Sequence, residues 1–155
     1  MTKKIFLVPI RQTKEENPEF VANPDCLEIL QMSIDFYKSA GYDPPWICYF
    51  AYAEGVPVGS AAYIGKPVDN RIEIAYGTMP AFRNKGIGGQ ICHELLRLAQ
   101  EVDPSLTIIA KTLKEENFST KILRKNGFRL MGTAWDKDEG EVWEWVYEAQ
   151  NDRSS

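Results

Sequence analysis

The stretch that decides the fold is residues 71–99, which read RIEIAYGTMPAFRNKGIGGQICHELLRLA. Residues 72–79 form a short apolar run rich in β-branched and aromatic side chains, and Pro80 closes it, which predicts a buried strand. The last part repeats apolar residues every three or four positions, which predicts an amphipathic helix. Its buried side is expected to carry Ile87, Ile91, Leu95, Leu98 and Val102, and its outer side Gln90, Glu94, Arg97 and Glu101.

Between the strand and the helix lies a glycine-rich loop, residues 83–89, with the sequence RNKGIGG. Glycine lets a backbone come close to a ligand, and the first N–H groups of a helix have no partner within the helix. The helix dipole favours an anion at this end, and Arg83 and Lys85 add positive charge. The loop therefore predicts a phosphate-binding site.

Two common phosphate-binding loops fit this sequence poorly. A mononucleotide-binding P-loop ends in Gly-Lys followed by Ser or Thr, whereas here Gly88 is followed by Gly89 and Gln90. A dinucleotide-binding fingerprint needs a third glycine where this chain has Ile91. The alternatives left open are a nucleotide-binding module of another class and a glycine-rich helix start that binds nothing.

The loop pattern Arg-x-x-Gly-x-Gly-Gly, after a strand with Glu73 near its start, resembles the GNAT superfamily of N-acetyltransferases. In that superfamily the loop holds the pyrophosphate of acetyl-coenzyme A, and the most similar branch is that of the ribosomal-protein N-terminal acetyltransferases. The resemblance implies direct transfer of an acetyl group from acetyl-coenzyme A to a primary amine, in a small molecule or at a peptide N-terminus. The alternative is a non-catalytic acyl-coenzyme A sensor on the same fold.

The order of expected elements covers nearly the whole chain. With 155 residues, 44% of them hydrophobic, we expect one domain over residues 1–150 and a disordered tail at 151–155. The expected fold is α+β, a mixed, mostly antiparallel twisted sheet of about seven strands flanked by helices, as in the GNAT superfamily. Strands are expected at 5–10, 46–53, 56–64, 71–79, 106–111, 128–135 and 141–147. Helices are expected at 25–40, with Leu27, Leu30, Ile34 and Tyr37 inward, at 87–102 and at 119–126.

The composition of the chain limits which partners and which compartment it is expected to have. The net charge of −4 and the pI near 5.1 argue against a nucleic-acid partner, and no apolar stretch reaches membrane-spanning length. Three cysteines without metal-like spacing favour reduced thiols in the cytoplasm and no metal site. We therefore expect a cytoplasmic protein whose partners are acetyl-coenzyme A and an amine, and we allow a homodimer.

An amine can attack the thioester only in its unprotonated form, so the reaction calls for a residue that accepts a proton from the amine. Residues 73–76, EIAY, are similar to the Glu-Ile-Val-Phe of histone acetyltransferases in the superfamily, whose glutamate is the general base, and this assigns that role to Glu73. Partial burial raises a carboxyl pKa and suits it to accept a proton. The alternative is a solvent-facing residue paired with Arg71.

Two further segments resemble the cofactor site. Residues 77–79 match the strand segment that binds the pantetheine arm, and Gly77 is expected to mark a bulge or a close backbone approach, with packing as its alternative. In residues 116–128, Asn117 is displaced by one from the family asparagine, and Leu123 replaces the tyrosine that protonates the thiolate. Either the thiolate leaves unprotonated, or Tyr76 or Ser119 is the donor. The expected catalytic residues are Glu73 and Tyr76; the expected cofactor-binding residues are Gly77, Thr78, Met79, Arg83, Asn84, Lys85, Gly86, Ile87, Gly88, Gly89, Asn117 and Ser119. Gly88→Val is expected to weaken coenzyme A binding and leave the fold intact.

The sequence says least about the site that binds the acceptor amine. In the superfamily it is built from two segments, here residues 26–46 and 131–145. Their acidic side chains would suit a cationic amine, and the alternative is that they only solvate a loop and a turn. Four tryptophans are expected to lie mostly in the core, with one or two at the cleft mouth. The acidic residues are Asp35, Asp43, Asp136, Asp138, Glu139 and Glu141, and the tryptophans are Trp46, Trp135, Trp143 and Trp145.

Overall fold

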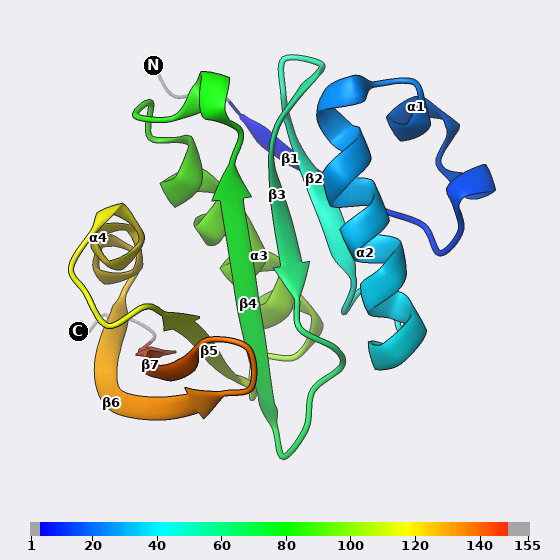
Figure 1. Cartoon of the computed structure of the whole chain (residues 1–155). Helices are drawn as coiled ribbons and strands as arrows, with labels where there is room; N and C mark the ends of the chain where they lie inside the picture. Colours follow the sequence, from blue (N-terminus) through cyan, green and yellow to red (C-terminus); the bar gives the residue numbers. More distant parts are fainter. Residues whose placement is uncertain (1–3, 149–155) are drawn as a thin grey trace.

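The computed structural model describes residues 4–148, so the predicted tail at 151–155 lies outside the described part. One sheet of seven strands runs in the order β1-β2-β3-β4-β5-β7-β6 (Figure 1), which confirms the predicted α+β fold. The strands are β1 (Ile5–Pro9), β2 (Cys48–Ala53), β3 (Val56–Tyr63), β4 (Arg71–Thr78), β5 (Thr107–Thr112), β6 (Phe128–Asp136) and β7 (Gly140–Tyr147). The helices are α1 (Pro18–Val21), α2 (Leu27–Ala40), α3 (Ile87–Val102) and α4 (Phe118–Lys125).

Strand β4 lies at the centre of the sheet. Its partner β3 is antiparallel, whereas β5 on the other side is parallel, with α3 making the crossover between β4 and β5. All other pairs are antiparallel, as expected. The predicted turn between β2 and β3 is tight, with positive φ at Glu54 (51°) and Gly55 (79°), a geometry that suits a two-residue hairpin.

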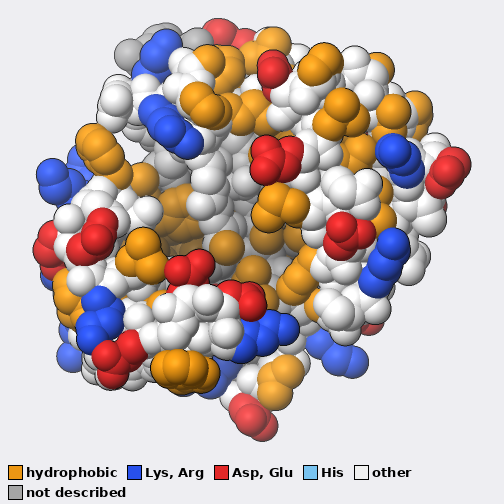
Figure 2. Space-filling model, viewed as in Figure 1, with side chains coloured by type: hydrophobic (Ala, Val, Ile, Leu, Met, Phe, Trp, Pro, Cys, Tyr) orange, Lys and Arg blue, Asp and Glu red, His pale blue; other side chains and the backbone are white. Residues whose placement is uncertain are grey.

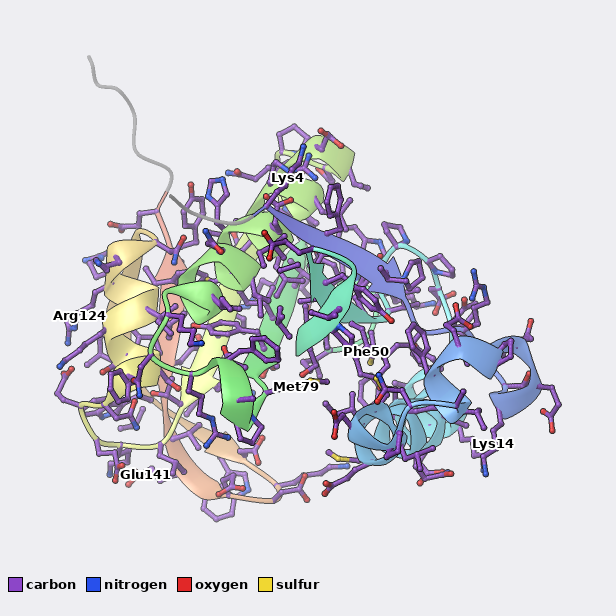
Figure 3. All side chains as sticks on the ribbon, turned by 90° about the horizontal axis from the view of Figure 1, so that it is seen from above. Lys4, Lys14, Phe50, Met79, Arg124 and Glu141 are labelled. Carbon is purple, nitrogen blue, oxygen red and sulfur yellow. The ribbon has the colours of Figure 1, made fainter. Side chains whose placement is uncertain are left out.

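The two faces of the sheet are covered differently. On one face lie α3 and α4, where the Tyr63 hydroxyl donates to the Leu95 carbonyl oxygen at 2.6 Å. On the other face α2 packs against the first strands, and the Tyr37 hydroxyl donates to the Ile10 carbonyl oxygen at 2.7 Å. Figure 3, seen from above, shows α3 and α2 on opposite sides, with Phe50 of β2 labelled on the side near α2. In Figure 1, α2 stands in front of the first strands and leaves the front of β4 without a helix over it.

The predicted helix stripes are right at their centres and wrong at some ends. In α3 the buried side is Ile87, Gly88, Ile91, Cys92, Leu95, Leu96 and Ala99, whereas Val102 is 48% exposed and Leu98 only partly buried. Steps of three and four residues drift around a helix with 3.6 residues per turn, so Ala99 takes the inward place expected for Leu98. In α2, Leu27 is 42% exposed and Ser33 is buried instead. Ser33 can be buried because its hydroxyl donates to the Ile29 carbonyl oxygen at 2.8 Å.

Candidate active site

Strands β4 and β5 separate halfway along their length. They pair only over the four positions from Arg71 opposite Thr107 to Ile74 opposite Ala110. Beyond this point β4 stays paired with β3 as far as Thr78, and β5 continues beside β7 alone. One edge of residues 75–78 therefore has no β5 partner and faces the gap between β4 and β5. Such an edge can hydrogen-bond an extended ligand.

The bulge expected at Gly77 is wrong. The pairing of β3 with β4 runs from Gly59 opposite Thr78 to Tyr63 opposite Ile74 without a register shift. A close backbone approach, the other feature expected at Gly77, is present, because a Cβ on the neighbouring Gly59 would stand 2.3 Å from the Gly77 carbonyl oxygen. Sequence reasoning missed Gly59, although a glycine inside a strand is the usual signal of such an approach.

The glycine-rich loop has the geometry of an anion site. Asn84 (φ 65°) and Gly86 (φ 77°) are both left-handed, and Gly86 is the N-cap of α3. The first hydrogen bond across this helix end runs from the Gln90 N–H to the Gly86 carbonyl oxygen at 3.3 Å. The N–H groups of residues 87–89 precede that bond and so have no carbonyl partner within the helix. Arg83 and Lys85 are exposed beside them, as predicted.

A cavity of about 830 Å³ connects this loop with the free edge of β4. Met79 and Lys85 do not line it, and the Met79 N–H is already bonded to the Val58 carbonyl oxygen at 2.8 Å, so its predicted ligand contact is not supported. Sequence reasoning missed four lining residues that come from the 3₁₀ turn before the loop and from α4, namely Phe82, Phe118, Ile122 and Lys125. The predicted residues that do line the cavity are Tyr76, Gly77, Thr78, Arg83, Asn84, Gly86, Ile87, Gly88, Gly89, Asn117 and Ser119.

Asn117 serves α4 as its N-cap. Its Oδ1 accepts from the Thr120 N–H at 3.2 Å, and the Thr120 hydroxyl oxygen accepts from the Asn117 N–H at 2.9 Å. This capping role accounts for Asn117 and limits what its side chain can offer a ligand. Ser119 is exposed on the first turn of α4, and Leu123 is buried (1% exposed) where the superfamily's tyrosine would stand.

Gly88 packs α3 against its neighbours. A Cβ there would stand 2.8 Å from Ile122 Cδ1 and 3.2 Å from Thr78 Oγ1. A larger side chain would therefore press on α4 and β4 as well as on a ligand. We replace the expectation that Gly88→Val leaves the fold intact, because overpacking of this kind destabilises a protein.

Glu73 lies on the opposite face of β4 from α3. Its Oε1 is 3.6 Å from Lys111 Nζ, and both side chains are about one-quarter exposed (24% and 26%). Burial raises the pKa of the Glu73 carboxyl, Lys111 lowers it, and Asp136 and Glu144 add to the rise, so the pKa stands above its ordinary value. Arg71 does not pair with Glu73; its guanidinium bonds Glu144 at 2.8 Å.

Tyr76 points to the α3 side of the same strand, because residues three apart on a strand face opposite sides. Its hydroxyl is buried, and it has no hydrogen-bond partner within residues 4–148. Burial raises its pKa above the ordinary value, with Cys92 as the next cause, so the hydroxyl stays protonated at neutral pH. The sheet thus carries a basic group on one face and a proton-bearing group on the other.

Several acidic side chains of the predicted acceptor cleft already bond to neighbouring groups of the protein. Asp136 Oδ2 accepts from the N–H groups of Asp138 and Glu139, both at 2.9 Å, and this closes the β6–β7 turn. Glu141 pairs with Lys114 at 2.5 Å, and Asp35 lies 3.7 Å from Lys38 on the outer side of α2.

The open face is hollowed beside β4. Figure 2 shows this hollow, with hydrophobic side chains along it and acidic side chains on the rim nearest the β6–β7 hairpin. Two of the tryptophans turn away from it. The Trp145 indole N–H donates to Thr112 Oγ1 at 2.9 Å and Arg124 lies 4.9 Å from its ring centre, so Trp145 faces α4, and Trp143 packs against it at 6.2 Å.

Metal-binding groups and membrane-spanning helices are both absent from the described part of the chain. Residues 4–148 contain no group of His, Cys, Asp or Glu side chains that could hold a metal ion. No helix in the same range is both long and apolar enough to cross a membrane.

Comparisons with known proteins agree with this arrangement. The family model described as acetyltransferase (GNAT) family matches residues 10–128. Comparison with curated protein sequences gave no significant match. Among solved structures, the RimL ribosomal L7/L12 α-N-protein acetyltransferase in complex with coenzyme A superposes with a TM-score of 0.67 at 15% identity, covering 94% of each chain.

Two other solved structures resemble the chain to a similar degree. An acetyltransferase of Bacillus subtilis in complex with coenzyme A has a TM-score of 0.63 at 18% identity, over 95% of this chain and 99% of that one. The microcin C7 self-immunity acetyltransferase MccE, in complex with acetyl-coenzyme A and AMP, has a TM-score of 0.66 at 15% identity, over 94% and 92%. At these identities the superpositions establish the fold alone.

Proposed function

Because the chain belongs to the acetyltransferase (GNAT) family, we propose that it moves an acetyl group from acetyl-coenzyme A to a primary amine by direct attack. The observation that carries the proposal is the position of the cavity, which runs from the free N–H groups of α3 to the unpaired edge of β4. Glu73 lies on the other face of that same strand. The acceptor is a small amine or a peptide N-terminus, and the acetyl donor is consumed as a co-substrate.

The loop and β4 supply the binding groups. The N–H groups of residues 87–89 and the dipole of α3 favour a pyrophosphate, with Arg83 and Lys85 adding positive charge nearby. The backbone of residues 75–78 has no β5 partner and can hydrogen-bond the amide-bearing pantetheine arm as a strand would; within it, the Thr78 carbonyl oxygen also accepts from the Arg83 Nε–H at 3.4 Å. A cavity of about 830 Å³ falls within the usual range of roughly 300–1,000 Å³ for small-molecule sites.

Glu73 takes a proton from the amine. An ammonium group has no lone pair, so it must lose a proton before the nitrogen can attack the thioester carbon. Burial raises the pKa of Glu73, which strengthens the carboxylate as a base, while the neighbouring Lys111 lowers the pKa and so favours the ionised form. A backbone N–H near Gly77 donates to the carbonyl oxygen as negative charge builds on it.

The leaving sulfur takes a proton from Tyr76 or Ser119, or departs as a thiolate. As nitrogen bonds to the carbonyl carbon, the carbon–sulfur bond breaks and the sulfur keeps the electron pair. The Tyr76 hydroxyl is buried next to Cys92 and makes no hydrogen bond of ordinary geometry within residues 4–148, and Tyr76 lines the cavity. Leu123, buried at the position of the family tyrosine, cannot act in this way.

The test is a thiol-release assay with acetyl-coenzyme A and a panel of amines and short peptides. We expect coenzyme A to be released only when an acceptor is present, and the acetylated amine to appear in equal amount. Tight coenzyme A binding without release above background would refute the enzyme and favour an acyl-coenzyme A sensor, which the buried Leu123 also fits. Binding of ATP or NAD and none of coenzyme A would refute both.

We also propose a cytoplasmic location. Cys26, Cys48 and Cys92 are all buried and free, which suits a reducing compartment. A homodimer and the boundaries of the single domain remain proposals, to be tested by light scattering and limited proteolysis of the full chain.

A further inference from the structure

On the open face of the sheet, a second and smaller cavity of about 240 Å³ lies beside the proposed reaction centre. Its wall on one side is the stripe of α2 formed by Ile29, Met32 and Phe36, and Ile64 closes part of the other side. The spacing of three and four residues places these side chains on one face of the helix. Met32 is 64% exposed and Ile64 40% exposed, so the apolar wall faces an open groove.

The floor of the groove consists of small side chains. Ser60 and Ala62 line it from β3, and the register places them opposite Gly77 and Ala75 of β4. Residues two apart on a strand share a face, so Ala75 and Gly77 lie on the same side as Glu73. The groove therefore opens directly onto the part of β4 where the amine must stand, with the base two residues from Ala75.

The polar groups at this wall are already bonded. The Ser33 hydroxyl donates to the Ile29 carbonyl oxygen at 2.8 Å, and the Cys48 N–H donates to the Tyr37 hydroxyl at 2.9 Å. The charged residues Asp35 and Lys38 pair with each other on the outer side of α2. Among the polar side chains that line the groove, only the Ser60 hydroxyl on the floor makes no hydrogen bond within residues 4–148, so the groove offers an acceptor mainly apolar contact and a single hydroxyl.

We infer that the acceptor carries an apolar group on the carbon next to its amine, and that Met32, Phe36 and Ile64 select it. This inference rests on the proposed function and names its substrate class. A cavity of 240 Å³ has room for one branched or aromatic side chain, since an engineered cavity of about 150 Å³ already holds benzene. Burial of an apolar group there lowers the free energy of binding, whereas a charged group would lose water without gaining a partner.

Two sources supply this chemistry, a small α-branched amine and a peptide whose first residue is apolar. The experiment measures coenzyme A release with leucinamide, serinamide and lysinamide, and with tetrapeptides that begin with the same three residues. We expect kcat/KM for the leucine compounds to exceed that for the serine compounds by about tenfold or more. A higher kcat/KM for the amides or for the peptides tells which source is the better acceptor.

A matched pair of variants on α2 tests the groove itself. Met32→Glu places a carboxylate in the groove and should lower the leucine-over-lysine preference about tenfold. A leucine side chain packed there would take the carboxylate out of water, whereas the lysine ammonium would be attracted to it. Gln31→Glu adds the same carboxylate on the exposed neighbouring position, outside the groove; it gives up the hydrogen bond from the Gln31 amide to Asp35 at 3.0 Å, which affects stability and not the choice of acceptor, so the preference should stay unchanged. Ile64→Glu, on the opposite wall, should repeat the effect of Met32→Glu.

Each outcome is decisive. Acetylation of all three amines at similar kcat/KM, or a preference that Met32→Glu and Ile64→Glu do not change, would overturn the inference and leave the proposed function standing. Absence of coenzyme A release with every acceptor would overturn the proposed function, and the inference with it.

Discussion

The cleanest test of the phosphate loop is the substitution Gly86→Ala. Gly86 has a φ of 77°, and a Cβ built on it meets no atom within 4 Å, so the cost of alanine there is the backbone angle alone. A left-handed angle costs an L-residue about 1–2 kcal/mol. Gly89 is the matched control, because it lies inside α3 and its Cβ would make only an ordinary contact, 3.9 Å from Asn126 Nδ2.

The two variants should move in opposite directions. Alanine is favoured over glycine in a helix by up to about 1 kcal/mol, so Gly89→Ala should be as stable as the parent or more so. The difference in the free energy of unfolding between the two variants is then about 1–3 kcal/mol. For a domain of this size that corresponds to roughly 2–12 °C in Tm, which thermal unfolding followed by circular dichroism can measure.

Calorimetry with coenzyme A completes the test. If Gly86→Ala relieves its strain by rotating the loop, the N–H groups of residues 87–89 turn away from the pyrophosphate and Kd should rise about tenfold or more, equivalent to about 1.4 kcal/mol. Equal stability of Gly86→Ala and the parent would refute the left-handed loop. Lost stability with unchanged coenzyme A affinity would refute the assignment of this loop to phosphate.

The remaining predictions concern the proposed chemistry and the packing beneath it. Glu73→Gln should lower kcat/KM by about 100- to 10,000-fold in the thiol-release assay, and full activity would remove Glu73 as the base. Because burial raises the pKa of Glu73, activity of the parent should be lost, as pH falls, at a pH above the ordinary glutamate value of 4.5. Lys111→Met removes the charge that lowers that pKa, so the acid limb of the pH–rate profile should move to higher pH, and a shift to lower pH would contradict the pairing. Tyr76→Phe removes a buried hydroxyl that has no hydrogen-bond partner of ordinary geometry among the described residues, so the free energy of unfolding in chemical denaturation should stay equal or rise by about 1 kcal/mol. The same variant should have a lower kcat, and an unchanged kcat would rule out Tyr76 as the proton donor. Gly88→Val should cost about 1–3 kcal/mol of stability through contact with Ile122, and an unfolding midpoint equal to that of the parent would contradict this packing.

The elements and the loop were predictable from sequence because each depends on local patterns. Apolar periodicity placed the helices, and the turn residues placed the hairpins, within a few residues of where they lie. The glycine-rich loop followed from its composition and its place before a helix. Errors arose at two positions of α2: Leu27 is exposed although it fits the apolar stripe, and Ser33 is buried because its hydroxyl donates to the Ile29 carbonyl oxygen of the same helix.

Most of the residues that line the cavity were predictable from sequence, whereas their arrangement in space was not. The place where β4 and β5 separate depends on which partner β5 prefers, and no local pattern states that choice. The ion pair of Glu73 with Lys111 joins residues on different strands, so the nearer Arg71 was the wrong candidate partner. The need for Gly59 depends on the Gly77 carbonyl oxygen of the next strand.

The end of β5 that leaves β4 keeps a strand partner on its other side. Strand β7 pairs with β5 from Ile109 opposite Val146 to Thr112 opposite Trp143, so β5 remains ordered in the sheet beyond the point where its pairing with β4 ends. Trp145, fully buried, fixes this arrangement through its N–H bond to Thr112 at 2.9 Å. On the proposed mechanism the acetyl group comes from the α3 side and the amine from the open face, so they can meet only through this gap. The parallel pairing of β4 and β5 must therefore end near Ile74, because ladder bonds extended to residues 75–78 would occupy the backbone groups that the ligand needs and would close the passage between the two faces.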